Sequence, residues 1–186
     1  MTGQHMGHTH VRGNAGGDMS RQSLRDKDFT VAEALKKAKY STALIGKWGL
    51  GEVGQEGHPL GQGFDYFYGY TAHRDAHYHY PQVGNRPIYD GFVDVTDRLA
   101  KSYSTDLITA RSKKWIVDHQ KAHPQQPFFI YLCYTAPHSG LRIPTTSHLT
   151  TSSNYPKGGG LSGGVQWNED ATHGQINTAI GTIDQG

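Results

Sequence analysis

The fold of this chain is decided by the stretch Ser41-Thr42-Ala43-Leu44-Ile45-Gly46-Lys47-Trp48-Gly49-Leu50-Gly51. Residues 41–45 are mostly apolar and predict a short strand. The glycines that follow allow the backbone to turn tightly and a ligand to approach it closely. Lys47 therefore lies where a strand ends, which is where open α/β sheets bind their ligands. The alternative is a surface lysine that merely follows a strand.

A helix is expected immediately before this strand. The segment Thr30-Val31-Ala32-Glu33 has the pattern of a capping box, in which the threonine and glutamate side chains bind the first backbone N–H groups. Apolar residues follow at helical spacing, namely Val31, Ala34, Leu35 and Ala38. The pattern predicts a helix of about ten residues that ends near Lys39-Tyr40.

A second helix and strand repeat this order further along the chain. The helix is expected from Ser104 to about Lys121. Its predicted buried stripe consists of Leu107, Ile108, Trp115 and Ile116. Residues 128–133 read Phe-Phe-Ile-Tyr-Leu-Cys, a nearly continuous apolar run that is typical of a central parallel strand covered on both faces.

Long segments without periodicity separate and follow these pairs. We expect ordered loops over residues 49–99 and 139–168, and a third helix that begins near Thr172. The glycine run at 157–160 lacks the ending and the following helix of a phosphate-binding loop. The order helix–strand, long loop, helix–strand predicts an α/β fold, a doubly wound sheet with helices on both faces and long loops.

Composition narrows the class of protein. The 186 residues fit one domain, and a net charge of +2 without a run of lysine or arginine argues against nucleic acid as a partner. No segment approaches the roughly 20 apolar residues of a membrane span. Residues 1–14 are polar and rich in histidine, unlike a signal peptide. Cys133 is the only cysteine and is expected to be a small core residue.

Twelve histidines are the compositional outlier. Some of them fall into two clusters, His5, His8 and His10, and then His73, His77 and His79. Neither cluster has cysteine partners or a helical histidine pair with a glutamate between, so neither has the pattern of a zinc site. Loop histidines that line a polar pocket are the preferred interpretation.

The two predicted strands end in a similar way. The first leads into Lys47, and the second leads through Thr135-Ala136-Pro137 to His138. If the strands are parallel neighbours, both side chains emerge at the carboxyl edge of the sheet. A lysine that holds charged oxygens and a histidine that donates a proton to a leaving oxygen suit an anionic ester. The alternative for His138 is a loop histidine bonded to the backbone.

Six segments, taken in chain order, have the form of known motifs. They are Met1-Thr2-Gly3-Gln4, then 8–14 (HTHVRGN), 30–36 (TVAEALK), 46–51 (GKWGLG), 63–70 (GFDYFYGY) and 127–138 (PFFIYL through APH). They resemble the sulfatase family of the alkaline-phosphatase superfamily, with its C-x-P-S-R-x-x-L-x-T-G, H-T-x-x-R-G-N, T-x-A-x-x-L-K, GKWHLG, G-F-D-x-F-x-G and P-F-F-L-Y-L…P-H segments. Each motif alone is modest, and the ordered set is specific.

The resemblance implies a sulfuric ester hydrolase with a partial alkaline-phosphatase-like fold. In this family a formylglycine made from cysteine or serine attacks sulfur, and calcium, held by Asp and Asn side chains, neutralises the sulfate. Lys47 matches the family lysine that contacts the sulfate oxygens. His138 matches the family histidine near the leaving-group oxygen.

The resemblance also sets expectations about what this chain lacks. The nucleophile is expected before Met1, and the calcium ligands outside residues 1–186, so this chain alone is expected to hold no metal. We expect a single incomplete sulfatase α/β domain segment over residues 1–186 that does not hydrolyse sulfate esters by itself. Gly49 stands where many members carry a histidine, so a second histidine near the sulfate is not expected from this motif.

The loop at 73–81 is predicted to face the substrate, with Arg74 and His77 as its binding residues; the alternative is a packed, tyrosine-rich loop without a role in binding. The expected partner is a small-molecule or glycan sulfate ester, and the family suggests a periplasmic or extracellular location. Three alternatives stay open: a related phosphoesterase, a non-catalytic remnant that binds sulfated glycans, and a truncated segment without an independent role.

Overall fold

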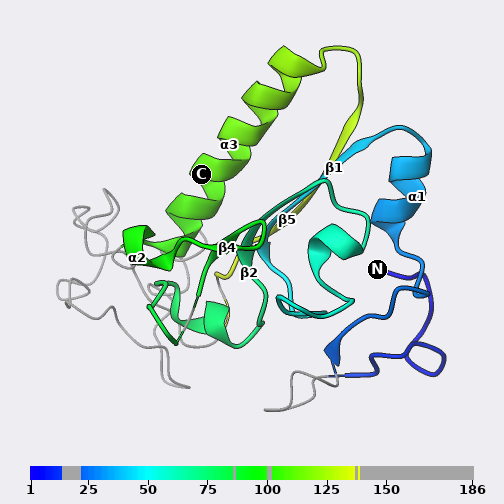
Figure 1. Ribbon diagram of the computed structural model, residues 1–186, viewed down its shortest axis with the longest axis horizontal. Helices are drawn as coiled ribbons and strands as arrows, with labels where there is room; N and C mark the ends of the chain where they lie inside the picture. The colour runs from blue at the N-terminus through cyan, green and yellow to red at the C-terminus, as the bar shows by residue number, and fades with distance from the viewer. Residues whose placement is uncertain (14–21, 86, 100–101, 137, 139–186) are drawn as a thin grey trace, which may run out of the picture.

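The fold is organised around the strand β1 (Ser41–Lys47). The computed structural model describes residues 1–13, 22–85, 87–99, 102–136 and 138. Its sheet has the order β4-β3-β2-β1-β5 (Figure 1). The other strands are β2 (Tyr66–Tyr70), β3 (Tyr89–Asp90), β4 (Val93–Asp94) and β5 (Phe128–Cys133). β1 pairs in parallel with β2 and β5, whereas β3 and β4 extend the sheet antiparallel. The predicted parallel pairing of the two strands is confirmed.

The helices cover both faces of this sheet. They are α1 (Val31–Lys37), α2 (Thr96–Leu99) and α3 (Ser104–Ala122), with the short 3₁₀ turns η2 (Pro59–Gly61) and η3 (Asp75–Tyr78). Because side chains alternate along a strand, β1 contributes to two cores. Ala43 and Ile45 pack with Ile108 of α3, and Leu44 packs with Ala32 of α1. Figure 1 shows α1 and α3 on either side of β1. This is the two-faced α/β arrangement that the sequence predicts.

Local sequence explains how α1 begins and ends. The predicted capping box is present: the Thr30 hydroxyl accepts from the Glu33 N–H, and the Glu33 carboxylate accepts from the Thr30 N–H. The helix ends two residues earlier than predicted, because Lys39 adopts a left-handed conformation with φ 68°. The N–H of Tyr40 then bonds the carbonyl of Leu35, as in a Schellman motif. A turn usually made by glycine is made here by a lysine.

The buried face of α3 differs from the predicted apolar stripe. Ile108 is buried, but Ile116 is exposed, so the prediction was wrong at that residue. The face turned to the sheet also carries small polar residues, namely Ser104, Thr105, Thr109 and Ser112. The hydroxyls of Ser104, Thr109 and Ser112 have hydrogen-bond partners; the Ser112 hydroxyl, for example, donates to the Ile108 carbonyl at 2.8 Å. Periodicity located the helix, but its buried face combines Ile108 with these small polar residues.

The strand β5 has the predicted bounds and a different environment. It lies at an edge of the described sheet, where it pairs only with β1. Phe128, Tyr131 and Leu132 are 37–42% exposed, so the prediction of a central strand covered on both faces was wrong for the described part of the molecule. Cys133 is only partly buried, not a core residue.

The segment 49–99, predicted as an irregular loop, contains β2, β3, β4 and α2. β2 was missed because Tyr-Phe-Tyr-Gly-Tyr lacks aliphatic residues, although aromatic residues favour strands. Residues 139–168, the glycine run at 157–160 and the helix predicted from Thr172 lie outside the described residues.

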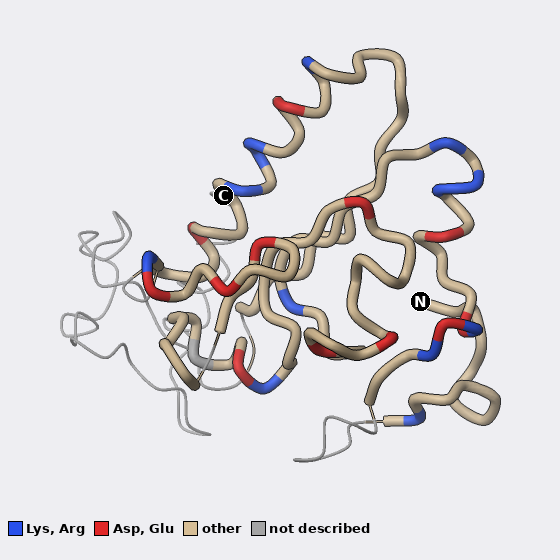
Figure 2. The backbone as a smooth tube through the Cα atoms, viewed as in Figure 1, with Lys and Arg blue, Asp and Glu red and all other residues tan. Residues whose placement is uncertain are grey.

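Charged residues of both signs are interspersed along α3 and the loops, and they do not form a continuous basic stripe over the described backbone (Figure 2). In that part of the chain, no helix has the length and apolarity that a bilayer span requires.

Candidate functional site

A cavity of about 480 Å³ lies at the carboxyl ends of β1 and β5. The two strands are in register there, with Gly46 opposite Cys133. Lys47 is the last residue of β1, and His138 follows β5 after a short turn. Both line the cavity, together with Gln22, Trp48, Gly49, Leu50, His73 and His77. The structure therefore brings the predicted lysine and histidine to one site.

Lys47 supplies the positive charge of this cavity. Burial lowers the pKa of its ammonium group, and the nearby Cys133 thiol partly offsets that effect. The side chain is half-buried, and none of the described ion pairs involves it. No aspartate or glutamate is among the described residues that line the cavity. An ammonium group in a partly desolvated site without a carboxylate is suited to bind an anion.

His77 and His138 form a stacked pair of imidazoles. Their ring centroids are 3.9 Å apart and their planes differ by 15°. The pKa of His77 is lowered to about 4, first by burial and then by the positive charges of His138, Lys47 and neighbouring groups. His77 is therefore neutral at pH 7 and can hydrogen-bond an anion or its ester without adding another charge.

A buried threonine hydrogen-bonds the segments that carry these rings. Thr135 is 2% exposed, and its hydroxyl bonds both His79 Nδ1, at 2.9 Å, and the Ser104 hydroxyl, at 2.8 Å. The carbonyl of Thr135 accepts from the backbone N–H of His138 at 3.2 Å. The segment that leaves β5 is thus fixed to the start of α3 and to the loop that follows η3.

The remaining site residues show what sequence could and could not reveal. Arg74 is exposed and is not among the lining residues, although its charge helps to lower the pKa of His73 and His77. Gln22 and His73 line the cavity and were not predicted as site residues. His73 belongs to the noted histidine cluster, which was the available signal, whereas nothing in the sequence distinguishes Gln22. A histidine does lie beside Gly49, supplied by a different loop.

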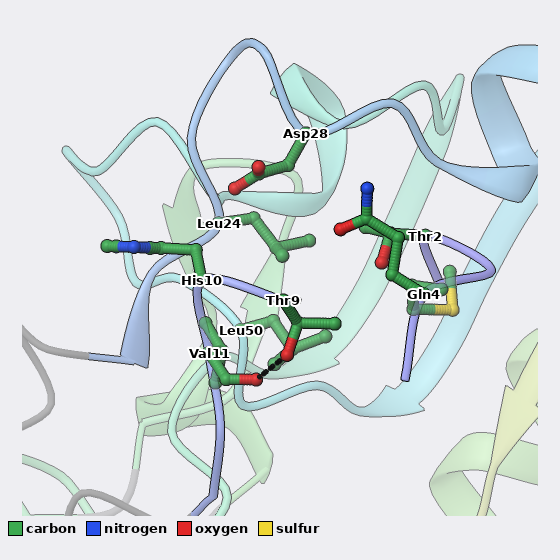
Figure 3. Close-up of a pocket in the computed structure, with 9 residues that line it drawn as sticks. Thr2, Gln4, Thr9, His10, Val11, Leu24, Asp28 and Leu50 are labelled. Carbon is green, nitrogen blue, oxygen red and sulfur yellow. Dashed lines mark hydrogen bonds between the residues drawn. The ribbon is translucent and has the colours of Figure 1, made fainter. Parts of the chain in front are cut away.

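A second, smaller pocket of about 120 Å³ lies under the N-terminal segment (Figure 3). Thr2, Gln4, Thr9 and His10 line it, and the carboxylate of Asp28 faces the same space. Arg25 binds that carboxylate at 2.7 Å and, mainly through this hydrogen bond, lowers its pKa. A pocket with an ionised carboxylate is a poor site for an anionic ester.

Histidine clusters are a common source of metal ligands. Among the residues that the structure describes, no group of three or more His, Cys, Asp or Glu side chains is arranged to hold a metal ion. In the first cluster His5 and His8 instead make an edge-to-face ring contact, with centroids 4.5 Å apart.

Comparison with known proteins identifies the family of the chain. The sulfatase family matches residues 1–185. The chain belongs to the sulfatase family. Among its relatives are arylsulfatase J of Mus musculus, 30% identical over 149 residues that cover 77% of this chain, and an arylsulfatase of Klebsiella aerogenes, 33% identical over 150 residues that cover 73%. These matches span 24% and 29% of the relatives' own lengths, so this sulfatase chain corresponds to about a quarter of them.

Solved structures support the fold of this sulfatase. The chain superimposes on Ps i-CgsB in complex with k-i-k-neocarrahexaose with a TM-score of 0.64 and 18% identity, over 88% of this chain and 35% of that one. BT4656 in complex with its substrate D-glucosamine-2-N,6-O-disulfate gives a TM-score of 0.52 and 23% identity, over 69% and 22%. The predicted alkaline-phosphatase-like α/β fold is confirmed.

Proposed function

We propose that this chain carries part of the active site of a sulfuric ester hydrolase. The observation that supports the proposal is the convergence of Lys47 and His138 on one cavity without a lining carboxylate among the described residues. A sulfate ester needs positive charge at its non-bridging oxygens and a proton donor at its bridging oxygen. The two side chains offer those functions from two neighbouring strands.

In this proposal Lys47 binds the non-bridging sulfate oxygens, where negative charge is held and redistributed as the S–O bond breaks. His138 hydrogen-bonds the bridging oxygen and transfers a proton to it as the leaving group departs. His77, stacked on His138, fixes the plane of that imidazole and contacts the ester. Arg74 lies outside the cavity lining, and we propose that it meets the more distant part of a substrate.

The proposed substrate is a small-molecule or glycan sulfate ester, in line with a cavity of about 480 Å³ that opens between loops. We also propose a periplasmic or extracellular location, on the family resemblance. The relatives include N-acetylgalactosamine-6-sulfatases, one of which, from Canis lupus familiaris, is 30% identical over 124 residues, 62% of this chain and 23% of its own length.

Formylglycine and calcium, which the resemblance implies, supply the nucleophile and charge neutralisation in that chemistry. Among the described residues, no group of His, Cys, Asp or Glu side chains fits a calcium ion. Cys133 does not fit the nucleophile either, since it is followed by Tyr-Thr-Ala in place of the x-Pro-Ser-Arg signature. Burial also raises the pKa of its thiol to about 11.

The proposal is tested by hydrolysis of matched aryl esters by the full-length protein. We expect turnover of p-nitrophenyl sulfate and little turnover of p-nitrophenyl phosphate. The opposite preference would favour the related phosphoesterase. Sulfate binding without turnover of either ester would favour the non-catalytic remnant.

The role of His138 is tested by its replacement with glutamine. His138→Gln removes the transferable proton, so the rate should fall by roughly 10²-fold on phenyl sulfate. The loss should be smaller on p-nitrophenyl sulfate, whose leaving oxygen needs less protonation. His123→Gln, at an exposed position after α3, is the matched control. Equal losses on both esters would contradict proton transfer by His138.

A further inference from the structure

A third histidine lines the cavity, and one glutamine side chain holds it. Gln22 Nε2 donates to the carbonyl oxygen of Gly49 at 2.9 Å and lies 3.2 Å from His73 Nδ1. Gln22 is 4% exposed. Because a carbonyl oxygen can only accept, the Gly49 bond identifies which end of the glutamine amide is the nitrogen.

This arrangement determines the tautomer of His73. An amide NH₂ group has two hydrogens to donate, and one of them goes to Gly49. The bond to His73 therefore requires Nδ1 to accept, which leaves the proton of the neutral ring on Nε2. Burial, together with the charges of Lys47, Arg74 and His138, lowers the pKa of His73 and favours that neutral ring.

Gly49 provides the space for this imidazole. A Cβ atom at Gly49 would lie 2.9 Å from the Cβ of His73, closer than side-chain carbons approach in folded proteins. The residue also has φ +112°, a conformation that other residues rarely adopt. Gly49 thus accepts the hydrogen bond that orients Gln22 and leaves room for the ring that Gln22 binds.

We propose that His73 is a further sulfate-binding residue that donates its Nε2–H to the anion, and that Gln22 is the positioning residue that sets this tautomer. The inference rests on the proposed function of the cavity. Nδ1 is already used by Gln22, and within the described residues no hydrogen bond to Nε2 is found, so Nε2 is the nitrogen left for a ligand. A neutral donor adds a hydrogen bond to the oxyanion without adding a second cation beside Lys47.

The tautomer is tested by long-range ¹H–¹⁵N NMR on protein labelled with ¹⁵N-histidine, with His73→Gln to assign the signal. We expect the Nε2–H pattern for His73 in the unaltered protein. Gln22→Glu keeps the shape and replaces the donor by an acceptor, so it should convert His73 to the Nδ1–H tautomer or to the imidazolium form. An Nδ1–H tautomer in the unaltered protein would overturn the inference.

The binding role is tested by calorimetric titration with inorganic sulfate. His73→Phe keeps a ring but removes the donor, and should weaken sulfate binding about 5- to 10-fold. His73→Gln, which keeps an N–H donor at similar reach, should restore most of that loss. Sulfate affinity unchanged in His73→Phe would refute the role of His73. If both His73→Phe and Lys47→Met bind sulfate as tightly as the unaltered protein, the proposed function of the cavity fails. If Lys47→Met loses sulfate binding and His73→Phe does not, only the inference about His73 fails.

Discussion

Replacement of Lys47 by methionine should change activity and stability in opposite directions. Methionine keeps most of the length and apolar stem of lysine and removes the ammonium group. In the proposed site that group faces the sulfate oxygens from a half-buried position, without a lining carboxylate among the described residues. One hydrogen bond to a charged group contributes about 1.5–3 kcal/mol, so sulfate binding should weaken roughly 10- to 100-fold. Because the charge on these oxygens changes in the transition state, the turnover rate should fall by roughly 10²–10³-fold.

The stability of the same variant follows from the direction of the lysine pKa. Burial lowers the pKa of Lys47 below its ordinary value of 10.5, so the folded protein holds this proton less tightly than the unfolded chain does. Removing the ammonium group should therefore leave the free energy of unfolding unchanged or raise it by up to about 1 kcal/mol. The unfolding free energy of the unaltered protein should rise as the pH rises towards 10.5 and so approach that of the variant, because the unfolded chain binds more protons than the folded protein in that pH range.

Two measurements check this pair of effects. Sulfate ester hydrolysis by the full-length protein gives the rate, and urea unfolding at pH 7 and pH 9.5 gives the stability. Lys113→Met, on the exposed face of α3, controls for loss of a surface charge. A Lys47→Met protein with full activity, or one destabilised by more than about 1 kcal/mol at pH 7, would refute the reasoning.

Three further variants test other features of the molecule. His77→Gln should reduce the fall in unfolding free energy between about pH 6.5 and 4, because the His77 pKa of about 4 in the folded state means that the unfolded chain takes up its proton first. If urea unfolding at pH 7 and pH 5 gives the same loss of free energy for the variant and the unaltered protein, this reasoning is contradicted. Lys39→Gly should stabilise the protein by about 1 kcal/mol in thermal unfolding, because glycine adopts the left-handed end of α1 without strain, and no gain would argue against that turn. Gly46→Ala should lower the free energy of unfolding by about 3 kcal/mol or more, because the new Cβ would lie 1.9 Å from the carbonyl oxygen of Cys133. Soluble expression and a melting temperature equal to those of the unaltered protein would contradict the close approach of β1 and β5 at this residue.

The part of the fold that sequence predicts is the part with strong local signals. The capping residues located α1, apolar runs located β1 and β5, and the spacing of α3 gave its length. The rule that open α/β sheets bind ligands at the carboxyl edge of their strands predicts from sequence that Lys47 and His138 lie at one site. These features depend on residues close in sequence, or on a general rule of topology.

The errors arise where distant residues decide the outcome. Whether β5 is central or at an edge depends on which strands pair with it, and its apolar residues alone do not contain that information. Ile116 is exposed because the face of α3 turned to the sheet is formed by Ile108 together with small hydroxyl residues, a mixture that apolar periodicity does not predict. Gln22 reaches the site by bonding Gly49 across 27 positions of sequence, which no local pattern reveals.

The threonine at position 135 lies behind the cavity and connects the two segments that carry its stacked imidazoles. Its hydroxyl bonds His79, in the loop that follows η3, and its carbonyl accepts from the backbone N–H of His138, so the segments of both stacked imidazoles are anchored to one residue. Lys47 lies on a different element, at the end of β1. A substitution at Thr135 is therefore expected to displace the imidazoles relative to the ammonium group of Lys47 without removing either. If the proposed function holds, such a variant would change which esters fit the cavity, although Thr135 is not among the residues that line it.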